Sequence, residues 1–570
     1  MAVCFMKLNR NLNREDAKGT KDKRAFFAVF APLRIVFSFL PFIALVIATL
    51  ACARSDTPTN FEAITPLPGD DSPFSFFQPG PTSTLAPDEA LASVEPPTSA
   101  APGLPTRTPR PTQDVSVSPT PDAPRQSALD RTVVEQYTVV RGDTLNEIGE
   151  RYGVTASALA AANGIALADT LFVGQVLQIP LPDQTAFGPS LKLLPDSEFV
   201  FGPGTVDFNI DGYIRAQGGY LATYTEEIAA VYLDGAMPRT LTGSEIVRLV
   251  ATRYSVSPQL LLAVLEHQSG WVTDPTPDGN TLTYPLRRVE VNREGLHRQL
   301  SWAANQLNFG YYAWRFGYLV SFVFEGNGLR LIDPGLNAGT VGVHNYFAKV
   351  HPLDEWTRDV SPSGYALTYA RLFGNPFRFA IEPLVPGDLT QPELTLPFEP
   401  GKVWAFTGGP HGAWDGGSAW AALDFAPPAQ ADGCVASDEW VVASAPGVVA
   451  RSEYGAVVID LDGDGFEGTG WNLFYMHLET RERVPVGTSV TTGDRLGHPS
   501  CEGGVSNGTH VHIARKYNGE WLNAAGRLPF VLDGWVAQEL PKEYDGYLVR
   551  GEVVLEACDC RAAGNEVSRP

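Results

Sequence analysis

The residues of this chain whose types and spacing could perform chemistry lie near its C-terminal end. Four of the nine histidines and one aspartate fall in one stretch with the alternating pattern of β-strands: His411, Asp424, His477, His510 and His512. Residues two apart on a strand point to the same face, so His510 and His512 can face one site together. Histidine and aspartate are ligand types of a catalytic zinc, which leaves one coordination position to water. The alternative is a set of ordinary sheet histidines without a metal. A fifth histidine of this stretch, His498, lies in a turn between Gly497 and Pro499, and we expect it at the surface rather than among the ligands.

The stretch 400–521 resembles the lysostaphin/LytM-type zinc endopeptidases, which cut the peptide part of bacterial peptidoglycan. The pattern of that family is a His…Asp pair, a Tyr-x-His-Leu and a final His-x-His, and this chain has the same order. The flanking residues agree too, since 445–449 resembles the strand-turn-strand before the sheet and 492–497 a glycine-marked turn. The resemblance implies an antiparallel β-sheet domain, which we place at residues 386–540.

The chain departs from the usual pattern of this family at the first histidine. Most members have His and Asp four residues apart, but Trp420 stands four residues before Asp424. The nearest upstream histidine is His411, and its longer spacing resembles the β-lytic branch, in which a loop separates the histidine from a Leu-Asp. On this alignment, the resemblance implies that His411, Asp424 and His512 hold one zinc ion per chain.

The same resemblance implies that His477 and His510 lie near the zinc-bound water without binding the metal. Zinc lowers the pKa of its water to roughly 7 and polarises the peptide carbonyl. The two histidines would orient or deprotonate that water and stabilise the oxyanion, which is worth roughly 100- to 10,000-fold in rate. The alternative function is a cell-wall binding protein, or an activator of other hydrolases, built on a metal-free peptidase fold.

The six cysteines leave four beyond the N-terminal segment: Cys434, Cys501, Cys558 and Cys560. Four cysteines allow three pairings, and export would permit disulfides. Cys434 and Cys501 flank the candidate site from two different loops, so we predict that they pair. Cys558 and Cys560 are separated by one residue, and we expect them not to close a disulfide without strain.

The N-terminal residues 1–53 are typical of an export signal or a membrane anchor. A basic start precedes the apolar run Ile35–Ala53, which is near the roughly 20 residues of a spanning helix. The run ends around Cys52 and leaves three outcomes open: lipidation at Cys52, ordinary signal cleavage, or an uncleaved anchor. We expect an exported protein in the cell envelope or outside the cell, attached to the membrane if the anchor or lipid is present. Residues 54–131 are rich in Pro, Thr, Ser and Ala and predict a semi-extended linker.

Residues 132–182 predict a compact β-α-α-β unit, with strand patterns at Tyr137–Val140 and Val173–Ile179 around two short helices. The unit resembles a LysM module, a fold that binds glycans containing N-acetylglucosamine. The resemblance implies glycan contacts in two loops, at Gly142, Asp143, Thr144, Asn163, Gly164 and Ile165.

Residues 199–385 predict a mainly helical domain. Apolar residues recur at helical spacing over Glu245–Glu266, with a break at Ser257-Pro258. This region distantly resembles the lysozyme-like transglycosylases, but Gln268 stands where their catalytic glutamate would be. A glutamine cannot protonate a glycosidic oxygen, and Glu266 lies on another helix face. We therefore expect a non-catalytic domain that binds glycan or acts as a spacer. The alternatives are a still-active lysozyme-like site and an unrelated helical domain.

Two further segments have specific expectations. Residues 460–465, Asp-Leu-Asp-Gly-Asp-Gly, resemble the start of a calcium loop, but the twelfth position is Trp471 rather than the glutamate that an EF-hand needs. We predict a β-hairpin with an acidic tip. Residues 541–570 are expected to form a C-terminal tail with one strand-like run, Tyr547–Leu555.

The length and charge of the chain narrow the class of protein. A chain of 570 residues exceeds a single core, so several domains are expected. The net charge of −22 argues against a nucleic-acid partner, whose phosphates would be repelled. We predict a multidomain α+β protein: an exported zinc endopeptidase that cuts stem or cross-bridge peptides of peptidoglycan while LysM holds it on the glycan.

Overall fold

The computed structural model describes residues 128–569, except 141, 183–185, 235–236, 325–327, 430 and 432. The expected signal or anchor segment, Cys52 and most of the linker lie outside the described residues. Within the described part of the chain, none of the helices combines the length and the apolar character that a membrane crossing requires.

The first unit has the expected β-α-α-β order. Its elements are β1 (Glu135–Thr138), α2 (Leu145–Tyr152), α3 (Ala156–Asn163) and β2 (Val176–Ile179), and β1 pairs antiparallel with β2. Helix α2 begins with a capping box between Thr144 and Glu147 and ends at Gly153, whose left-handed φ of 69° suits glycine. Arg131 donates to the carbonyls of Ile179 and Pro180. This unit therefore includes the last residues assigned to the linker.

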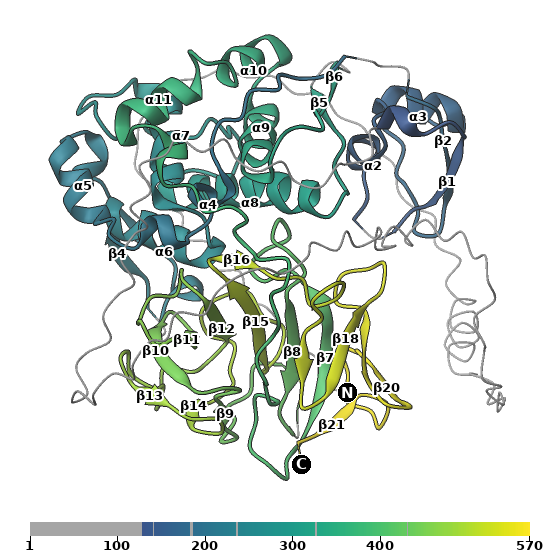
Figure 1. The fold of residues 1–570 in the computed structure, drawn as a ribbon, viewed down its shortest axis with the longest axis vertical. Coiled ribbons are helices and arrows are strands. Elements are labelled where there is room, and N and C mark those ends of the chain that lie inside the picture. The colour runs from purple at the N-terminus through teal and green to yellow at the C-terminus, as the bar shows by residue number, and fades with distance from the viewer. Residues whose placement is uncertain are drawn as a thin grey trace, which may run out of the picture. The chain divides into compact units, whose positions relative to one another are not determined.

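The middle block is mainly helical and also contains two short β-hairpins (Figure 1). Its elements are α4 (Asp196–Phe199), α5 (Ile210–Gln217), β3 (Thr225–Ile228), β4 (Arg239–Thr242), α6 (Gly243–Tyr254), α7 (Pro258–Ser269), α8 (Leu296–Arg315), β5 (Ser321–Phe324), β6 (Gly328–Leu331), α9 (Ala338–Val350), α10 (Leu353–Asp359) and α11 (Tyr365–Phe373). The predicted break between α6 and α7 is present. Ser257 caps α7 and Pro258 occupies its first turn, where a missing N–H costs nothing.

The C-terminal region is built around a nine-stranded sheet in which every strand pair is antiparallel. The order is β13-β10-β11-β12-β15-β8-β7-β21, and β16 pairs with β15. The strands are β7 (Val403–His411), β8 (Ala422–Ala426), β10 (Gly447–Glu453), β11 (Ala456–Asp460), β12 (Trp471–Met476), β13 (Ser489–Val490), β15 (Val511–Tyr517), β16 (Glu520–Trp521) and β21 (Glu566–Ser568). A four-stranded sheet follows, with β17 (Val531–Leu532), β18 (Trp535–Glu539), β19 (Gly546–Arg550) and β20 (Val553–Glu556), and β9 (Val441–Val442) pairs with β14 (Arg495–Gly497).

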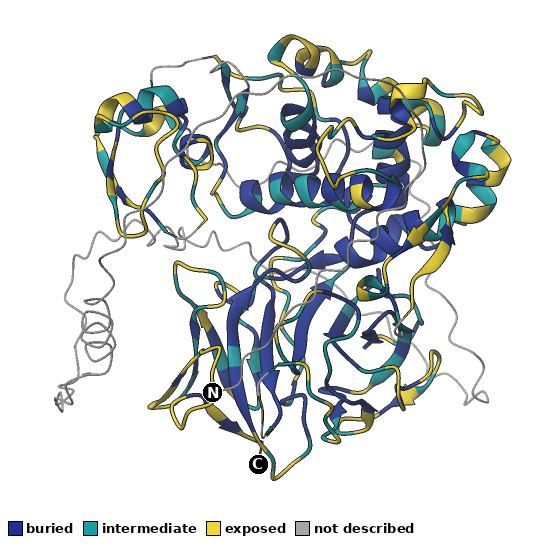
Figure 2. Cartoon of the chain, turned by 180° about the vertical axis from the view of Figure 1, so that it is seen from behind, coloured by how far each residue is buried: buried dark blue, intermediate teal, exposed yellow. Residues whose placement is uncertain are grey.

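Both faces of the central strands are buried (Figure 2). Side chains alternate between two cores, because successive residues of a strand point to opposite faces. Phe474 belongs to a core that continues into the helices of the middle block, whereas its neighbour Tyr475 belongs to a second core within the C-terminal region. The middle block and the sheet therefore share one continuous hydrophobic core.

Residues 541–570 do not form a separate tail, so that expected boundary is wrong. The single predicted run is divided into β19 and β20 by a turn at Gly551, which has a left-handed φ of 61°. Strand β21 then pairs with β7 and completes one edge of the large sheet. The predicted acidic hairpin is present, since β11 and β12 pair across the loop 461–470.

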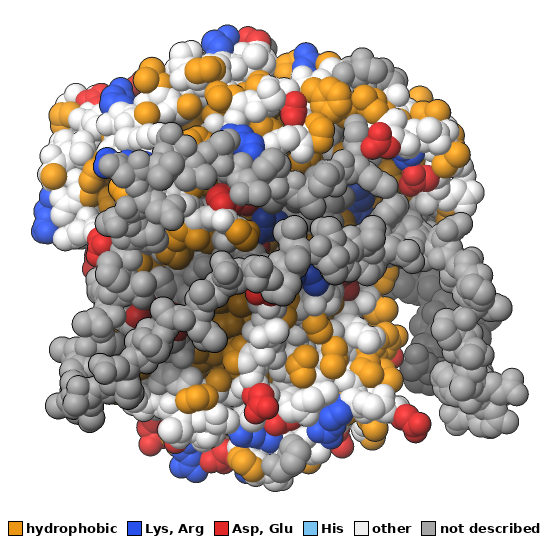
Figure 3. All heavy atoms as spheres, in the orientation of Figure 1, with side chains coloured by type: hydrophobic (Ala, Val, Ile, Leu, Met, Phe, Trp, Pro, Cys, Tyr) orange, Lys and Arg blue, Asp and Glu red, His pale blue; other side chains and the backbone are white. Residues whose placement is uncertain are grey.

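Charged side chains are dispersed over the described surface. On the face drawn in Figure 3, acidic and basic side chains are interspersed with apolar ones, and the described residues of that face do not form a continuous basic patch.

Candidate metal centre

Three neighbouring strands bring His411, Asp424 and His512 together. His411 ends β7, Asp424 lies in the middle of β8, and His512 lies directly opposite Asp424 where β15 pairs with β8. One ligand atom from each residue lies within 4.8 Å of the other two. Strand β7 is irregular next to Gly408, where a Cβ would lie 2.5 Å from the Asp424 carboxylate. Glycine at position 408 thus makes room for the carboxylate.

Backbone carbonyls determine which imidazole nitrogens face the centre. His411 Nδ1 donates to the Gly409 carbonyl at 2.8 Å, and His512 Nε2 donates to the Ala413 carbonyl at 3.0 Å. A neutral imidazole has one N–H, so the other nitrogen of each ring is left as an acceptor. These two nitrogens lie 3.0 Å apart, and each is 3.3 Å from Asp424 Oδ1.

The three acceptor atoms fit a cation. Asp424 Oδ1 is buried and makes no hydrogen bond with the described residues. Burial alone would raise the pKa of Asp424, but His411 and His510 beside it hold that pKa well below its usual range. Two imidazole nitrogens and one carboxylate oxygen are a donor set that catalytic zinc sites use, and the carbonyls behind the imidazoles would orient them for a metal.

His477 and His510 lie next to this trio and are held in the same way. His477 Nδ1 donates to the Glu502 carbonyl at 3.0 Å, and His510 Nδ1 donates to the Gly508 carbonyl at 2.7 Å. Their ring centroids are 4.6 Å apart, and His510 Nε2 lies 3.6 Å from Asp424 Oδ1. Burial lowers the pKa of His477 well below its ordinary value, and the two histidines of the last motif lower it further. A neutral His477 can accept a proton through Nε2.

The sequence did not correctly predict two residues near the site: His498 was expected at the surface, and Tyr544 was not singled out. His498, expected at the surface, is only 2% exposed, because the Glu439 carbonyl and the Glu482 carboxylate bind its two ring nitrogens. Tyr544 stacks on His411 with ring centroids 4.2 Å apart. It lies in the segment expected to be a tail, and no motif or spacing in the sequence could have indicated it.

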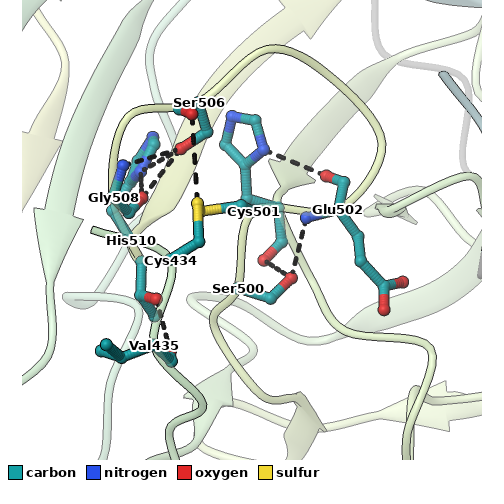
Figure 4. The surroundings of a disulfide bond; sticks show 10 residues. Cys434, Val435, Ser500, Cys501, Glu502, Ser506, Gly508 and His510 are labelled. Carbon is teal, nitrogen blue, oxygen red and sulfur yellow. Dashed lines mark hydrogen bonds between the residues drawn. A yellow bond between two sulfur atoms is a disulfide. The ribbon is translucent and has the colours of Figure 1, made fainter. Parts of the chain in front are cut away.

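The described residues form two disulfides. Cys434 and Cys501 are joined as predicted, with a Cα–Cα distance of 5.8 Å (Figure 4). Cys558 and Cys560 are joined as well, a pair that we expected not to close without strain. The backbone turns tightly between them, with Cys560 N donating to the Cys558 carbonyl, and their Cα atoms lie 5.0 Å apart, within the usual range for a disulfide.

The predicted glycan-contacting side chains mostly stabilise their own unit. Asp143 accepts from Tyr137 and from the Val140 N–H, and Thr144 caps α2. Asn163 bonds to the backbone of Leu159 and Gln178. Gly142 and Gly164 have left-handed backbones, and Ile165 packs against the core of the unit. In the following loop, Phe172 and Val173 are 72% and 70% exposed.

In the middle block, Glu266 has a structural role. It accepts from the N–H groups of Val272 and Thr273 and pairs with Arg371, so it holds the turn that follows α7. Gln268 is buried, and its side-chain nitrogen has no partner among the described residues. The non-catalytic role of this block stays a prediction.

Comparison with known proteins agrees with these regions. Residues 137–180 match the LysM domain family, and residues 192–385 match the family described as the LasA N-terminal domain. Protease LasA of Pseudomonas aeruginosa is 25% identical over 362 residues, which cover 59% of this chain and 77% of LasA. The chain is thus similar to protease LasA, and residues 137–180 are similar to LysM domains.

Other similarities are more limited. A chitin elicitor-binding protein of Oryza sativa subsp. japonica is 36% identical over 74 residues, or 12% of this chain and 21% of that protein. Among solved structures, the M23 metalloprotease pseudoalterin from the deep sea is 23% identical, with 30% of this chain and 96% of that one covered and a TM-score of 0.24. The catalytic domain of lysostaphin from Staphylococcus simulans is 21% identical, with 22% and 88% covered and a TM-score of 0.15.

Proposed function

We propose that this LasA homologue is an exported zinc endopeptidase that cuts stem or cross-bridge peptides of peptidoglycan. The main support is the convergence of His411 Nε2, Asp424 Oδ1 and His512 Nδ1, three buried atoms that lie 3.0 to 3.3 Å from one another. These atoms would hold one zinc ion per chain. When bound, zinc would supply a Lewis acid for the peptide carbonyl and a water of lowered pKa.

The remaining chemistry belongs to His477 and His510. Each donates its Nδ1–H to a backbone carbonyl, so each keeps Nε2 free for proton transfer. Because His477 is neutral, it can take a proton from the attacking water and pass one to the leaving amide nitrogen. His510 lies beside it, and its Nε2, once protonated, can donate to a developing oxyanion. Such positioned acid–base groups contribute roughly 100- to 10,000-fold.

The LysM unit would hold the enzyme on N-acetylglucosamine-containing glycan. Two linked sites turn the second binding event into an intramolecular one, which raises the local concentration of peptide substrate. The exposed ring of Phe172, in the loop that leads into β2, offers an apolar face for a sugar ring. Its replacement by alanine should weaken retention on insoluble peptidoglycan without changing zinc content.

The test uses the full chain. Metal analysis should find one zinc per chain, and digestion of purified peptidoglycan should release fragments with new peptide amino termini and no new reducing sugar ends. His512→Ala should lose both zinc and activity. A protein that is retained on peptidoglycan but binds no zinc and releases nothing would instead be the metal-free wall-binding protein. Full zinc and activity in His411→Ala would require a different ligand set.

A further inference from the structure

Residues 500–510 are here called the cystine loop, because Cys501 joins them to Cys434 (Figure 4). The loop contains His510 and contacts His477 through Glu502. The inference below rests on the proposed function, since it concerns the proton-transferring roles of His477 and His510. Its starting point is that the residues on either side of the two cysteines make the bonds that hold these histidines.

On the Cys501 side, the neighbouring residues hold His477. Ser500 donates to the His477 carbonyl through its N–H at 2.7 Å and its hydroxyl at 2.9 Å, and the Glu502 carbonyl accepts from His477 Nδ1. The Ser500 hydroxyl also accepts from the Glu502 N–H at 3.0 Å. His477 has a left-handed φ of 64°, which is uncommon for a non-glycine residue and persists only where its surroundings fix it.

On the Cys434 side, the neighbouring residues hold the segment that leads into His510. Thr509 donates through its N–H to the Gly433 carbonyl at 3.1 Å and through its hydroxyl to the Val435 carbonyl at 2.5 Å. The Gly508 carbonyl, which accepts from His510 Nδ1, belongs to the same segment and accepts from the Ser506 hydroxyl at 2.8 Å. One covalent bond therefore links the group that holds His477 to the group that holds His510.

We propose that the Cys434–Cys501 disulfide is a positioning element of the active site: it fixes the Glu502 and Gly508 carbonyls that keep Nδ1 protonated and Nε2 free in both catalytic histidines. Without the bond, the cystine loop is tied at this point only by hydrogen bonds, and each carbonyl can move relative to its imidazole. A misplacement of about 1 Å near a reacting group can cost roughly 100-fold in rate. The enzyme then reaches full activity only in a compartment oxidising enough for the disulfide to form.

The first experiment compares two disulfide-free variants of the full, zinc-loaded chain. In Cys434→Ala/Cys501→Ala, kcat should fall by roughly 10- to 100-fold, with KM and zinc content almost unchanged. The matched control is Cys558→Ala/Cys560→Ala, which removes a disulfide but leaves the cystine loop tied to Cys434, and which should keep its kcat. Equal kcat in both double variants and the wild type would overturn the proposal, because a cross-link that only stabilises the fold changes the melting temperature and not kcat.

A second variant covers the case in which the double variant does not fold. Ser500→Ala keeps the disulfide but removes the hydroxyl that joins the His477 carbonyl to the Glu502 N–H. It should also lower kcat at unchanged zinc content, since it loosens the same carbonyl. Wild-type kcat in Ser500→Ala would contradict the positioning role of this part of the loop.

The third measurement does not depend on activity. In ¹⁵N-histidine-labelled protein, NMR should find the Nδ1–H tautomer for His477 and His510, with His477→Gln and His510→Gln used to assign the signals. In the Cys434→Ala/Cys501→Ala variant these two histidines should average between tautomers, while His411 and His512 keep their signals. Unchanged tautomers would overturn the proposal. A zinc-loaded wild type with these tautomers but no peptidase activity would refute the proposed function and leave the positioning inference standing.

Discussion

The four histidines of the site have one feature in common: one nitrogen of each ring donates a hydrogen bond to a backbone carbonyl. For three of them the bound nitrogen is Nδ1, whereas His512 uses Nε2 and presents Nδ1 to the centre. The two atoms that face the centre are thus different nitrogens, on strands β7 and β15, which lie on either side of β8. Such carbonyl partners raise ligand basicity and fix ring orientation in metal sites.

The proposed separation of the metal ligands from the proton-transfer groups His477 and His510 leads to a direct prediction. His477→Ala and His510→Ala should keep one zinc per chain and the native fold, yet lose roughly 100-fold or more in peptidoglycan hydrolysis. Zinc stoichiometry measured beside hydrolysis for each variant tests this. His512→Ala is the matched comparison for His510→Ala, since the two lie two residues apart. Zinc loss in His510→Ala with zinc retained in His512→Ala would reverse the assignment of the pair.

The sequence alone could indicate the site residues but not their geometry. Order and spacing were enough to single out Asp424 and His510–His512, because the Leu-Asp and His-x-His patterns are short and each lies within one strand region. The tautomers could not be predicted, since the Glu502 and Ala413 carbonyls come from loops without a recognisable pattern. The same reason hides the stacking of Tyr544 on His411, which depends on how a distant segment returns to the sheet.

At the scale of elements, the β11–β12 loop concentrates acidic groups. Asp460, Asp462 and Asp464 each place a carboxylate oxygen within 4.8 Å of the others. Burial, together with hydrogen bonding and charge from Asp462, raises the pKa of Asp460 to about 8. A pKa raised in the folded state means that the folded protein binds a proton which the unfolded chain releases near 3.8. The resulting stabilisation is complete below that pH and is lost as the pH rises through about 8.

We therefore expect the free energy of unfolding of the wild type to contain a component that decreases between these two pH values. Asp460→Asn should remove this component, because its side chain does not ionise. Denaturant unfolding at several pH values, in buffers with a chelator, measures the difference between the two proteins. The control is Asp438→Asn at an exposed side chain, which should leave the pH dependence as in the wild type. A constant difference between Asp460→Asn and wild type across this range would contradict the prediction.

Elements with strong local signals could be predicted and those without them could not. The side chains of Thr144 and Ser257 cap the first turns of α2 and α7. Such caps depend only on neighbouring residues, so the sequence indicates both helices. Strand β21 has three residues and pairs with β7 from far along the chain. Nothing local distinguishes such a strand from a loop, because its stability comes from the partner strand. The expected tail boundary was wrong for this reason.

At the scale of the whole described chain, the middle block and the sheet meet through a buried ion pair as well as a shared core. Glu520 in β16 is 4% exposed and accepts from Tyr311 at 2.9 Å and from Arg315 at 2.6 and 3.0 Å, both in α8. Burial raises the pKa of Glu520 and Arg315 opposes this rise. The more exposed pair between Arg248 and Glu453 adds little by comparison. The two regions should therefore unfold together.

Arg315→Ala tests this coupling, because it leaves the Glu520 carboxylate buried without its counter-charge. Breaking a buried pair from one side costs about 3–5 kcal/mol, so the variant should unfold at clearly lower denaturant concentration. The control is Arg215→Ala, which removes an exposed pair with Asp211 and should cost less than about 1 kcal/mol. Tryptophan fluorescence and release of zinc to a chromogenic chelator should report one shared transition in the wild type and in both variants. The opposite outcome would be a lower fluorescence midpoint in Arg315→Ala with zinc release at its wild-type midpoint. The middle block and the nine-stranded sheet would then be independent folding units, and the ion pair would only connect two domains that fold separately.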